Sequence, residues 1–272
     1  MLVIEHHSIP LRSRMDNFRS AIALALSRGV VLLSREYQQS YPLRQAWLPG
    51  ARKQFVVPNG IDLAAFQPRR SFASEIVQAK RIVIGMASRL VPSKEHDVLL
   101  RALAQLRVGV DRIDVELRVA GDGPTADRLV NLSIELGIHD RVTFLGHVEG
   151  DDLRTFFSGL DLYAHATLGE GLSIALLEAA ACSLPIVASD VVGVRDVFVD
   201  GQTAILVAPS DPQAMAGGIR RAAHPTVGPA FGRRAREMVE ESYSSTRVRE
   251  GYREAMNAID PLGPWLGACG PH

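Results

Sequence analysis

Two carboxylates, Glu170 and Glu178, stand eight residues apart in the run EGLSIALLEAAACSLP, a pattern that predicts a helix opening after a strand. Gly171 permits a tight turn at the start of that helix. There the free amides of Leu172 and Ser173 and the positive end of the helix dipole favour a phosphate. The helix is apolar nearly all round, so Glu178 is expected to be buried. A buried carboxylate needs a partner, either ligand hydroxyls or neighbouring backbone.

Two cations follow another predicted strand, in the segment GMASRLVPSK. Arg89 and Lys94 would neutralise a diphosphate leaving group without a metal ion, because a forked guanidinium and an ammonium both donate to phosphate oxygens. Taken alone, each is better explained as a surface cation. Gly121 follows the next strand in the run AGDGP, and an isolated Gly-x-Gly indicates only a turn.

These residues fall in the loops of a regular alternation between short β-rich runs and helical patterns. The candidate strands span 81–86, 115–120, 141–145, 161–165, 185–189 and 204–207. The helical patterns between them span 96–108, 125–136, 152–158, 173–181 and 212–223. Strict alternation predicts a doubly wound parallel sheet, whose ligands bind beyond the carboxyl ends of the strands. We therefore expect the loops after the strands to line one site.

Composition and charge narrow the class of protein. The 272 residues are 47% hydrophobic and carry 30 basic and 30 acidic side chains, a balance that does not favour a nucleic-acid partner. Cys182 and Cys269 lie far apart and suggest neither a disulfide framework nor a zinc site. Asp151 and Asp152 begin a predicted helix and are interpreted as a cap, not a metal-binding pair. Without a signal peptide or an apolar run of ~20 residues, the chain is expected to be soluble and cytoplasmic.

The first 62 residues show the same alternation of apolar runs and helical patterns over a shorter length. Apolar runs at 2–4 and 30–33 flank a predicted helix at 17–26. Two strands expose too much apolar surface to form a domain by themselves. The PNGID turn at 58–62 separates this fragment from the main domain.

Six features in order carry a family resemblance: VVPNGID, MASRLVPSK, VAGDGP, RVTFLGHV, the run EGLSIALLEAAACSLPIVASD and its Glu-x7-Glu spacing. Together they closely resemble the retaining family 4 glycosyltransferases of the GT-B fold, over about residues 50–260. The resemblance implies an α/β protein with one complete Rossmann-like parallel-sheet domain of about six strands and a partial second one. The implied divisions are a remnant of the acceptor-side domain, the nucleotide-sugar-binding domain, a crossover helix and a flexible tail, at 1–62, 63–244, 245–260 and 261–272.

The resemblance also implies an activity and assigns roles by position. A hexose would pass from a nucleotide-diphosphate-sugar to an unidentified sugar or lipid-linked acceptor, in glycan, lipopolysaccharide or exopolysaccharide biosynthesis, without a cofactor or metal. Arg89 and Lys94 would bind the donor diphosphate, helped by the backbone of residues 171–173. Glu178 would hold the ribose and Glu170 the transferred sugar. Because the leaving phosphate assists the acceptor on the front face, no carboxylate nucleophile is required.

Further roles fall on loop residues. The backbone near His147 and Val148 would hold the nucleobase edge, and Gly121 would line the donor site. His6 or His7 occupies the strand end where many relatives place an active-site histidine; His7 is the catalytic candidate, and a surface or core histidine is the alternative.

The sequence also departs from the family pattern. Glu95 stands where a glycine commonly follows the loop lysine, and Ser183 and Val192 replace other usual glycines. Arg195 and Asp196 stand where Pro-Glu is frequent. None of these changes removes a named contact, although Glu95 would weaken the local positive potential if it pointed the same way as the lysine.

The larger departure is at the front, where only about the last third of the family's N-terminal domain is expected. The segment 245–259 resembles the family's final helix, which packs back on that domain and here would have little to pack on. One hypothesis is an enzyme completed by a second polypeptide or by a longer gene product. Others are a nucleotide-sugar-binding module without transferase activity and, least favoured, a relative with different chemistry such as an epimerase. Peripheral association with the inner membrane face is left open.

Overall fold

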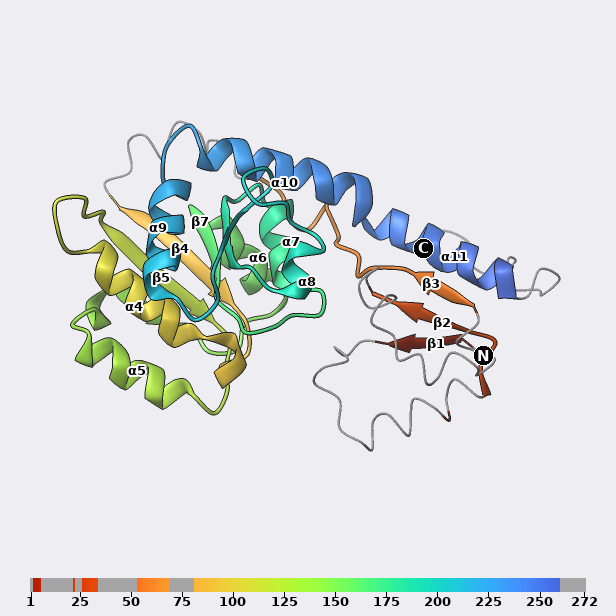
Figure 1. Ribbon diagram of the computed structural model, residues 1–272, viewed down its shortest axis with the longest axis horizontal. Helices are drawn as coiled ribbons and strands as arrows, with labels where there is room; N and C mark the ends of the chain where they lie inside the picture. Colours follow the sequence, from red (N-terminus) through yellow and green to blue (C-terminus); the bar gives the residue numbers. More distant parts are fainter. Residues whose placement is uncertain (1, 6–21, 23–25, 34–52, 69–80, 260–272) are drawn as a thin grey trace. The chain divides into compact units, whose positions relative to one another are not determined.

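The computed structural model describes residues 2–5, 22, 26–33, 53–68 and 81–259 (Figure 1). The chain divides into two compact units, and each is described by itself. The larger unit is the continuous segment Ile61–Ser244. The smaller unit combines Met1–Gly60 with Ser245–His272.

A parallel sheet of six strands forms the centre of the larger unit, in the order β6-β5-β4-β7-β8-β9. Its strands are β4 (Ile82–Ala87), β5 (Val115–Ala120), β6 (Val142–Phe144), β7 (Leu162–His165), β8 (Ile186–Ser189) and β9 (Ile205–Val207). The chain runs outward from β4 to β6, returns to β7 beside β4, and runs outward again to β9. This confirms the predicted doubly wound α/β architecture and places a topological switch point between β4 and β7.

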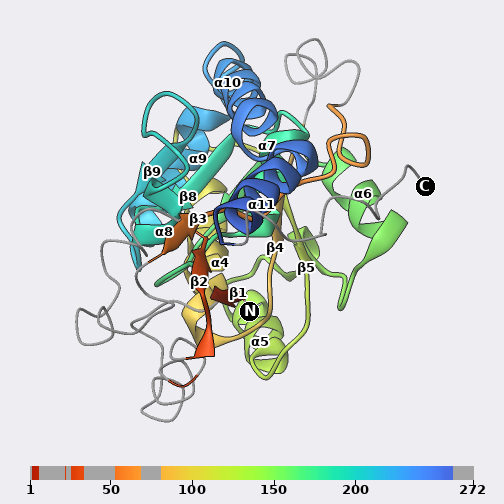
Figure 2. The same ribbon diagram turned by 90° about the vertical axis from the view of Figure 1, so that its right-hand side faces the viewer.

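Helices cover both faces of this sheet (Figure 1, Figure 2). The main hydrophobic core lies between the sheet and α4 (His96–Leu106), α5 (Ala126–Glu135) and α9 (Pro212–Ala222). Elsewhere α7 (Ile174–Ala181) and α10 (Gly228–Ser242) pack against each other and against β8. Among the described residues of this unit, the remaining helical segments are η4 (Pro92–Lys94), η5 (His139–Arg141), α6 (Gly150–Ser158) and α8 (Val192–Arg195).

Local chemistry sets where these helices begin. Asp211 caps α9 by accepting a hydrogen bond from the Ala214 amide at 2.9 Å, with a proline in the first turn. The predicted cap at Asp151 and Asp152 is wrong, because α6 has Glu149 at its N-cap position and both aspartates lie inside the first turn. Their charge there favours the positive end of the helix dipole.

The smaller unit contains, among its described residues, the parallel sheet β1-β2-β3 and one long helix. The strands are β1 (Leu2–Glu5), β2 (Gly29–Leu32) and β3 (Gln54–Val56), and the helix is α11 (Ser245–Ile259). Ala255 of α11 is buried in a cluster with Val31 and Val57. The helix was expected to have little to pack on, and Ala255 is its one buried residue, with Val248 and Tyr252 partly buried against the same cluster.

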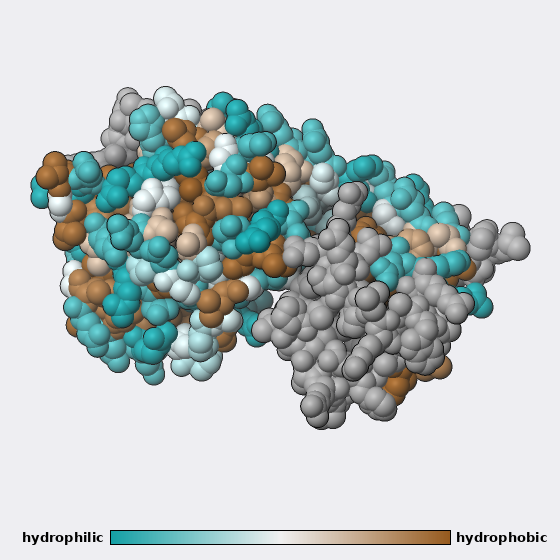
Figure 3. All heavy atoms as spheres, viewed as in Figure 1, coloured by the Kyte–Doolittle hydropathy of each residue, from teal (hydrophilic) through white to brown (hydrophobic). Residues whose placement is uncertain are grey.

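The surface view shows hydrophilic and hydrophobic side chains mixed over the larger unit (Figure 3). Within the described part of the chain, no helix combines the length and the apolar character that crossing a membrane requires. The predicted tail at 261–272 and most of the predicted helix at 17–26 lie outside the described residues.

Candidate functional site

Three loops at the carboxyl edge of the larger sheet are joined through Thr167. This fully buried residue follows β7, and its amide donates to Ser189 Oγ at the end of β8, at 3.0 Å. Its hydroxyl lies 3.1 Å from the carbonyl oxygen of Ser93, after β4, and the Leu168 amide donates to the same carbonyl at 2.9 Å. The loops beside the switch point therefore share one hydrogen-bonded framework.

The loop after β5 supports the segment that carries Arg89. The Ser88 amide donates to the Ala120 carbonyl at 3.0 Å, and a Cβ atom on Gly121 would come within 1.9 Å of the Ser88 carbonyl oxygen. Gly121 also has a φ of +140°, so glycine is needed here on two grounds. Arg89 itself is exposed and makes no ion pair with any described residue. Gly121 thus packs against the backbone of Ser88 and Arg89, the latter the predicted phosphate-binding arginine.

Glu170 and Lys94 meet in this framework. The Lys94 ammonium contacts Oε1 of Glu170, and Nε2 of His165 lies 2.6 Å from the same oxygen. The three side chains are largely buried, with exposed fractions of 9% for Glu170, 15% for Lys94 and 1% for His165. Two residues that the sequence assigns to different parts of a ligand are here in direct contact.

The ionisation of Glu170 follows from these neighbours. Burial alone raises the pKa of this carboxyl, but the His165 hydrogen bond and the charges of His165 and Lys94 outweigh it and lower the pKa to about 2. Glu170 is therefore a carboxylate at neutral pH and acts only as a hydrogen-bond acceptor.

His165 is a functional candidate that the sequence reasoning missed. Its ring stacks on Tyr163, with centroids 6.0 Å apart, and its Nδ1 lies 3.4 Å from the Tyr163 hydroxyl. That hydroxyl accepts from the Ala87 amide at 3.1 Å and donates to the Ala87 carbonyl at 3.2 Å. A signal was available in the sequence, because His165 ends a predicted strand at the ligand-binding edge, five residues before Glu170.

Glu178 lies in α7 with 9% of its surface exposed. No described side chain or backbone group donates a hydrogen bond to its carboxyl, so the backbone partner that the sequence left open is not found in the part of the chain that the structure describes. Burial raises the pKa of Glu178 to about 7. The two acids of the Glu-x7-Glu pair thus differ in partners and in ionisation.

The segment predicted to bind an anion lies at the start of α7, and its role stays a prediction. Ser173 is the N-cap, and its Oγ accepts from the Leu176 amide at 3.4 Å. The amides of Gly171, Leu172 and Ser173 donate to no group among the described residues. The helix itself begins at Ile174, so the free amides lie in the loop and the first turn.

Two of the departures from glycine have a common structural setting. Glu95 and Ser183 both have positive φ, +34° and +57°, the region that glycine adopts most easily. The Glu95 carboxylate is buried and accepts hydrogen bonds from the amide of Ser210, at 3.2 Å, and from its hydroxyl. Because Lys94 contacts Glu170, the two adjacent charges have different partners. Glu95 thus links the loop after β4 to the loop after β9.

The remaining predicted residues fall into two groups. His147 is exposed and Val148 half-buried, and both follow Gly146, whose carbonyl accepts from the Gly121 amide at 2.6 Å. They therefore lie at the same edge of the sheet, and their role stays a prediction. His6 and His7 lie outside the described residues.

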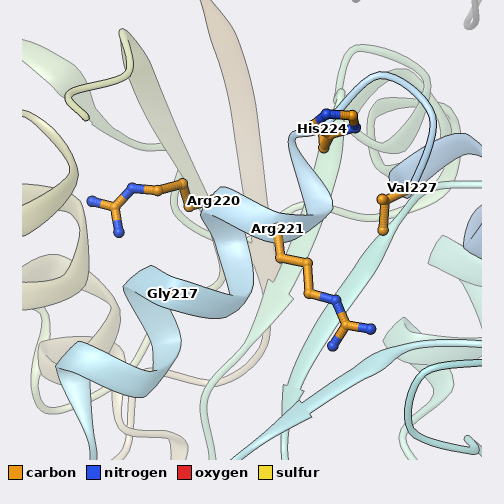
Figure 4. A pocket seen from close by; sticks show the side chains of 5 residues that line it. All are labelled: Gly217, Arg220, Arg221, His224 and Val227. Carbon is orange, nitrogen blue, oxygen red and sulfur yellow. The ribbon is translucent and has the colours of Figure 1, made fainter.

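The described part of the larger unit also has a group of cationic side chains near the end of α9, away from this cluster. Within the described ranges, no group of three or more His, Cys, Asp or Glu side chains is arranged to hold a metal. A depression at the end of α9 is lined by Gly217, Arg220, Arg221, His224 and Val227 (Figure 4). Its cationic side chains point in different directions. One donates to a backbone carbonyl and another covers the Phe231 ring, so they do not converge on a ligand.

Comparison with known proteins adds sequence relatives. Residues 69–241 match the family model described as glycosyl transferases group 1. A D-inositol 3-phosphate glycosyltransferase of Mycolicibacterium vanbaalenii is 36% identical over 211 residues, which are 71% of this chain and 45% of that protein. A GDP-mannose-dependent alpha-(1-6)-phosphatidylinositol monomannoside mannosyltransferase of Mycolicibacterium smegmatis is 33% identical over 170 residues, 58% of this chain and 44% of that protein. The chain spans about half the length of the curated relatives it matches.

Solved structures show the same fold. A crystal structure of Anabaena HepE in complex with UDP and glucose aligns with a TM-score of 0.80 and 23% identity, over 94% of this chain and 71% of that one. Sucrose-phosphate synthase from Thermosynechococcus elongatus aligns with a TM-score of 0.76 and 24% identity, over 94% of this chain and 68% of that one. At such identities the likeness is one of fold.

Proposed function

The chain belongs to the group 1 glycosyl transferases and has their GT-B type of fold, and from this premise we propose that it transfers a hexose from a nucleotide-diphosphate-sugar with retention of configuration. The observation that carries the proposal is the cluster at the switch point. An ionised acid contacts a lysine at the carboxyl edge of the sheet, and the loop that follows leads into α7. Among the described residues, the amides of this loop and the second acid, on α7, have no hydrogen-bond partner. Each of these features matches one part of such a donor.

The diphosphate is assigned to Arg89, Lys94 and the start of α7. Arg89 is exposed and makes no ion pair among the described residues, so its guanidinium is available to a ligand. The free amides before Ile174 and the positive end of the helix dipole favour the same negative charge. Lys94 would then serve both the leaving phosphate and Glu170. This arrangement supplies cationic stabilisation of the leaving group from side chains.

The ribose is assigned to Glu178. A carboxyl that is buried without a protein partner is costly, and two vicinal hydroxyls of a nucleoside would donate to it. Glu170 is assigned to the hydroxyls of the transferred sugar, because it is ionised and accepts hydrogen bonds. As the leaving phosphate assists the incoming acceptor, Glu170 positions the sugar and does not attack it.

The relatives support a hexose donor. The names of two of them specify a glycosyltransferase acting on D-inositol 3-phosphate and a GDP-mannose-dependent mannosyltransferase, and a structural neighbour was crystallised with UDP and glucose. We place the reaction in glycan or other polysaccharide biosynthesis, on a sugar or lipid-linked acceptor in the cytoplasm or at the inner membrane face. The chain covers 45% of the first of these relatives, and acceptor-side structure supplied by a second polypeptide or by a longer gene product is part of this proposal.

Donor binding can be tested before transfer. UDP, GDP and ADP at millimolar concentration should each be screened for a rise in Tm, since a ligand at 100 times its Kd stabilises the native state by about 2.7 kcal/mol. Glu178→Ala should weaken binding of the preferred nucleoside diphosphate, whereas Glu170→Ala should chiefly weaken the nucleotide-sugar. Glu135→Ala, an exposed acid on α5, is the charge-matched control. No shift with any nucleotide, or equal losses in both variants, would contradict the assignment.

Transfer is then measured separately, as release of the nucleoside diphosphate with a panel of acceptors. A chain that binds the donor but releases no diphosphate would favour the alternative function of a nucleotide-sugar-binding module or one subunit of a split transferase.

A further inference from the structure

Glu170 lies in a stretch without regular secondary structure, between the end of β7 and the start of α7. It is flanked by Gly169 and Gly171, and glycine places few limits on the backbone around it. Thr167 holds the backbone at Gly169, but the Glu170 side chain still has several rotamers available. Its direction must therefore come from the side chains that contact it.

The contacts of Glu170 are unequal between its two oxygens. Oε1 accepts from both His165 and Lys94, whereas Oε2 has no hydrogen-bond partner among the described residues. Because Glu170 is ionised and can only accept, the facing Nε2 of His165 carries a hydrogen. One oxygen is thus held by the protein and the other is left for a ligand.

The two groups that hold Oε1 differ in rigidity. Lys94 ends a flexible side chain and is also the cation that the proposed diphosphate needs. His165 is fixed at the end of β7, is 1% exposed, and stacks on Tyr163. The Tyr163 hydroxyl is in turn bonded to both backbone groups of Ala87, at the end of β4. A continuous set of contacts therefore runs from the two central strands to one oxygen of Glu170.

We infer that His165 is a positioning residue: its Nε2–H holds Oε1 of Glu170 so that Oε2 faces the hydroxyls of the transferred sugar. The inference rests on the proposed function and adds a residue to it. Support of this kind, in which a buried group orients the group that meets the ligand, sets the geometry of many binding sites. The support from His165 matters most when Lys94 binds the diphosphate, because His165 is then the remaining fixed partner of Glu170.

The test compares substitutions of His165 in the full chain. Gln extends an amide donor to about the position of Nε2, Asn carries the same amide one methylene short, and Phe keeps the ring without a donor. For each variant, Kd is measured calorimetrically for the preferred nucleoside diphosphate and for its hexose conjugate. The ratio of the two values isolates the contribution of the sugar.

The wild type should bind the conjugate more tightly than the diphosphate. The ratio of the diphosphate Kd to the conjugate Kd should fall about ten-fold in His165→Phe and His165→Asn. The diphosphate Kd itself should change by less than about two-fold. His165→Gln should keep most of the wild-type ratio. In a Glu170→Ala background, His165→Phe should change the ratio no further, because the histidine acts through the carboxylate. A merely structural histidine would instead lower both affinities together.

Two results would overturn the inference while leaving the proposed function intact. One is a wild-type ratio in His165→Phe and His165→Asn. The other is a fall in the Kd ratio that is as large in His165→Gln as in His165→Asn. The comparison of these two variants decides the question even if the Phe variant does not fold. A wild-type chain that binds no nucleotide would overturn the proposed function, and the inference with it.

Discussion

A Cβ atom placed on Gly193 would come within 2.0 Å of the carbonyl oxygen of Gly171. The carbonyl oxygen of Glu170 would lie only 2.4 Å away. The loop of the first acid and the start of α8 therefore approach each other backbone to backbone, which only glycine permits. The preceding Val192, which replaces a usual glycine, is 46% exposed, and this position accepts a branched side chain.

Substituting Gly193→Ala should displace the loop that carries Glu170. We expect the free energy of unfolding to fall by about 1–3 kcal/mol, as in other overpacked sites, and binding of the nucleotide-sugar to weaken. Gly169→Ala is the matched control, since a Cβ there meets nothing within 4 Å. Urea unfolding and calorimetry measure the two effects, and equal behaviour of the two variants would contradict the steric argument.

The bond between Glu95 and Ser210 should contribute to stability. Glu95→Ala removes a buried, charge-assisted pair of hydrogen bonds and should cost about 1.5–3 kcal/mol. Glu95→Gly should be less destabilising by about 1 kcal/mol, because glycine adopts the positive φ without strain. A double-mutant cycle with Ser210→Ala, followed by urea unfolding, measures the coupling. Additive effects would show that the contact contributes nothing.

Glu178 should make stability depend on pH in an unusual direction. Its pKa is raised by burial from 4.5 to about 7, so the native state binds more protons than the unfolded state between these values. The stability of the neutral form is fully present below pH 4.5 and is lost as the pH rises through 7. Glu178→Gln stays neutral, so it should match the wild type near pH 4.5 and exceed it by up to about 3 kcal/mol at pH 8.

Urea unfolding between pH 5 and 8 tests this difference. The lowered pKa of Glu170 acts in the opposite direction, with stability present above pH 4.5 and lost as the pH falls through about 2, and it is common to both proteins. Glu135→Gln serves as the exposed control. If the free energies of unfolding of the wild type and Glu178→Gln change with pH in parallel, the pKa of Glu178 is not raised by burial.

The Cys182 thiol should be unreactive in the native protein. It is 4% exposed, and burial raises its pKa to about 12, so almost no thiolate is present at pH 8. In a Cys269→Ser background, we expect labelling by a thiol reagent to be about a thousand-fold slower than in urea. Stopped-flow absorbance gives both rates. Labelling at the rate of a free thiol would contradict the burial of this side chain.

Much of the larger unit follows from its pattern of apolar residues. The strand at 115–120 has the predicted bounds, because alternate side chains of Val115–Ala120 are buried and its ends meet polar loops. The predicted strand at 141–145 is too long, since Arg141 ends the short helix η5. The carboxyl edge was predictable as the ligand-binding edge because strand alternation alone determines a doubly wound sheet.

The contacts within the site could not be predicted in the same way. Glu95 bonds to a residue 115 positions later, a distance over which local pattern carries no information. His165 ends a strand in which every residue is buried. Local pattern does not distinguish a histidine of the core from one that contacts a site residue. The packing of α11 depends on Val31 and Val57, which face the helix only once the small sheet has formed.

The smaller unit is assembled from segments at both ends of the chain, and this has a consequence during synthesis. The ribosome releases β1, β2 and β3 first, then the whole of the larger unit, and α11 after that. The larger unit is continuous and can fold as it emerges. The cluster of Val31 and Val57 is completed only when Ala255 of α11 has been synthesised. A nascent chain paused inside the larger unit therefore has an apolar sheet without its helix, a surface to which a chaperone would bind.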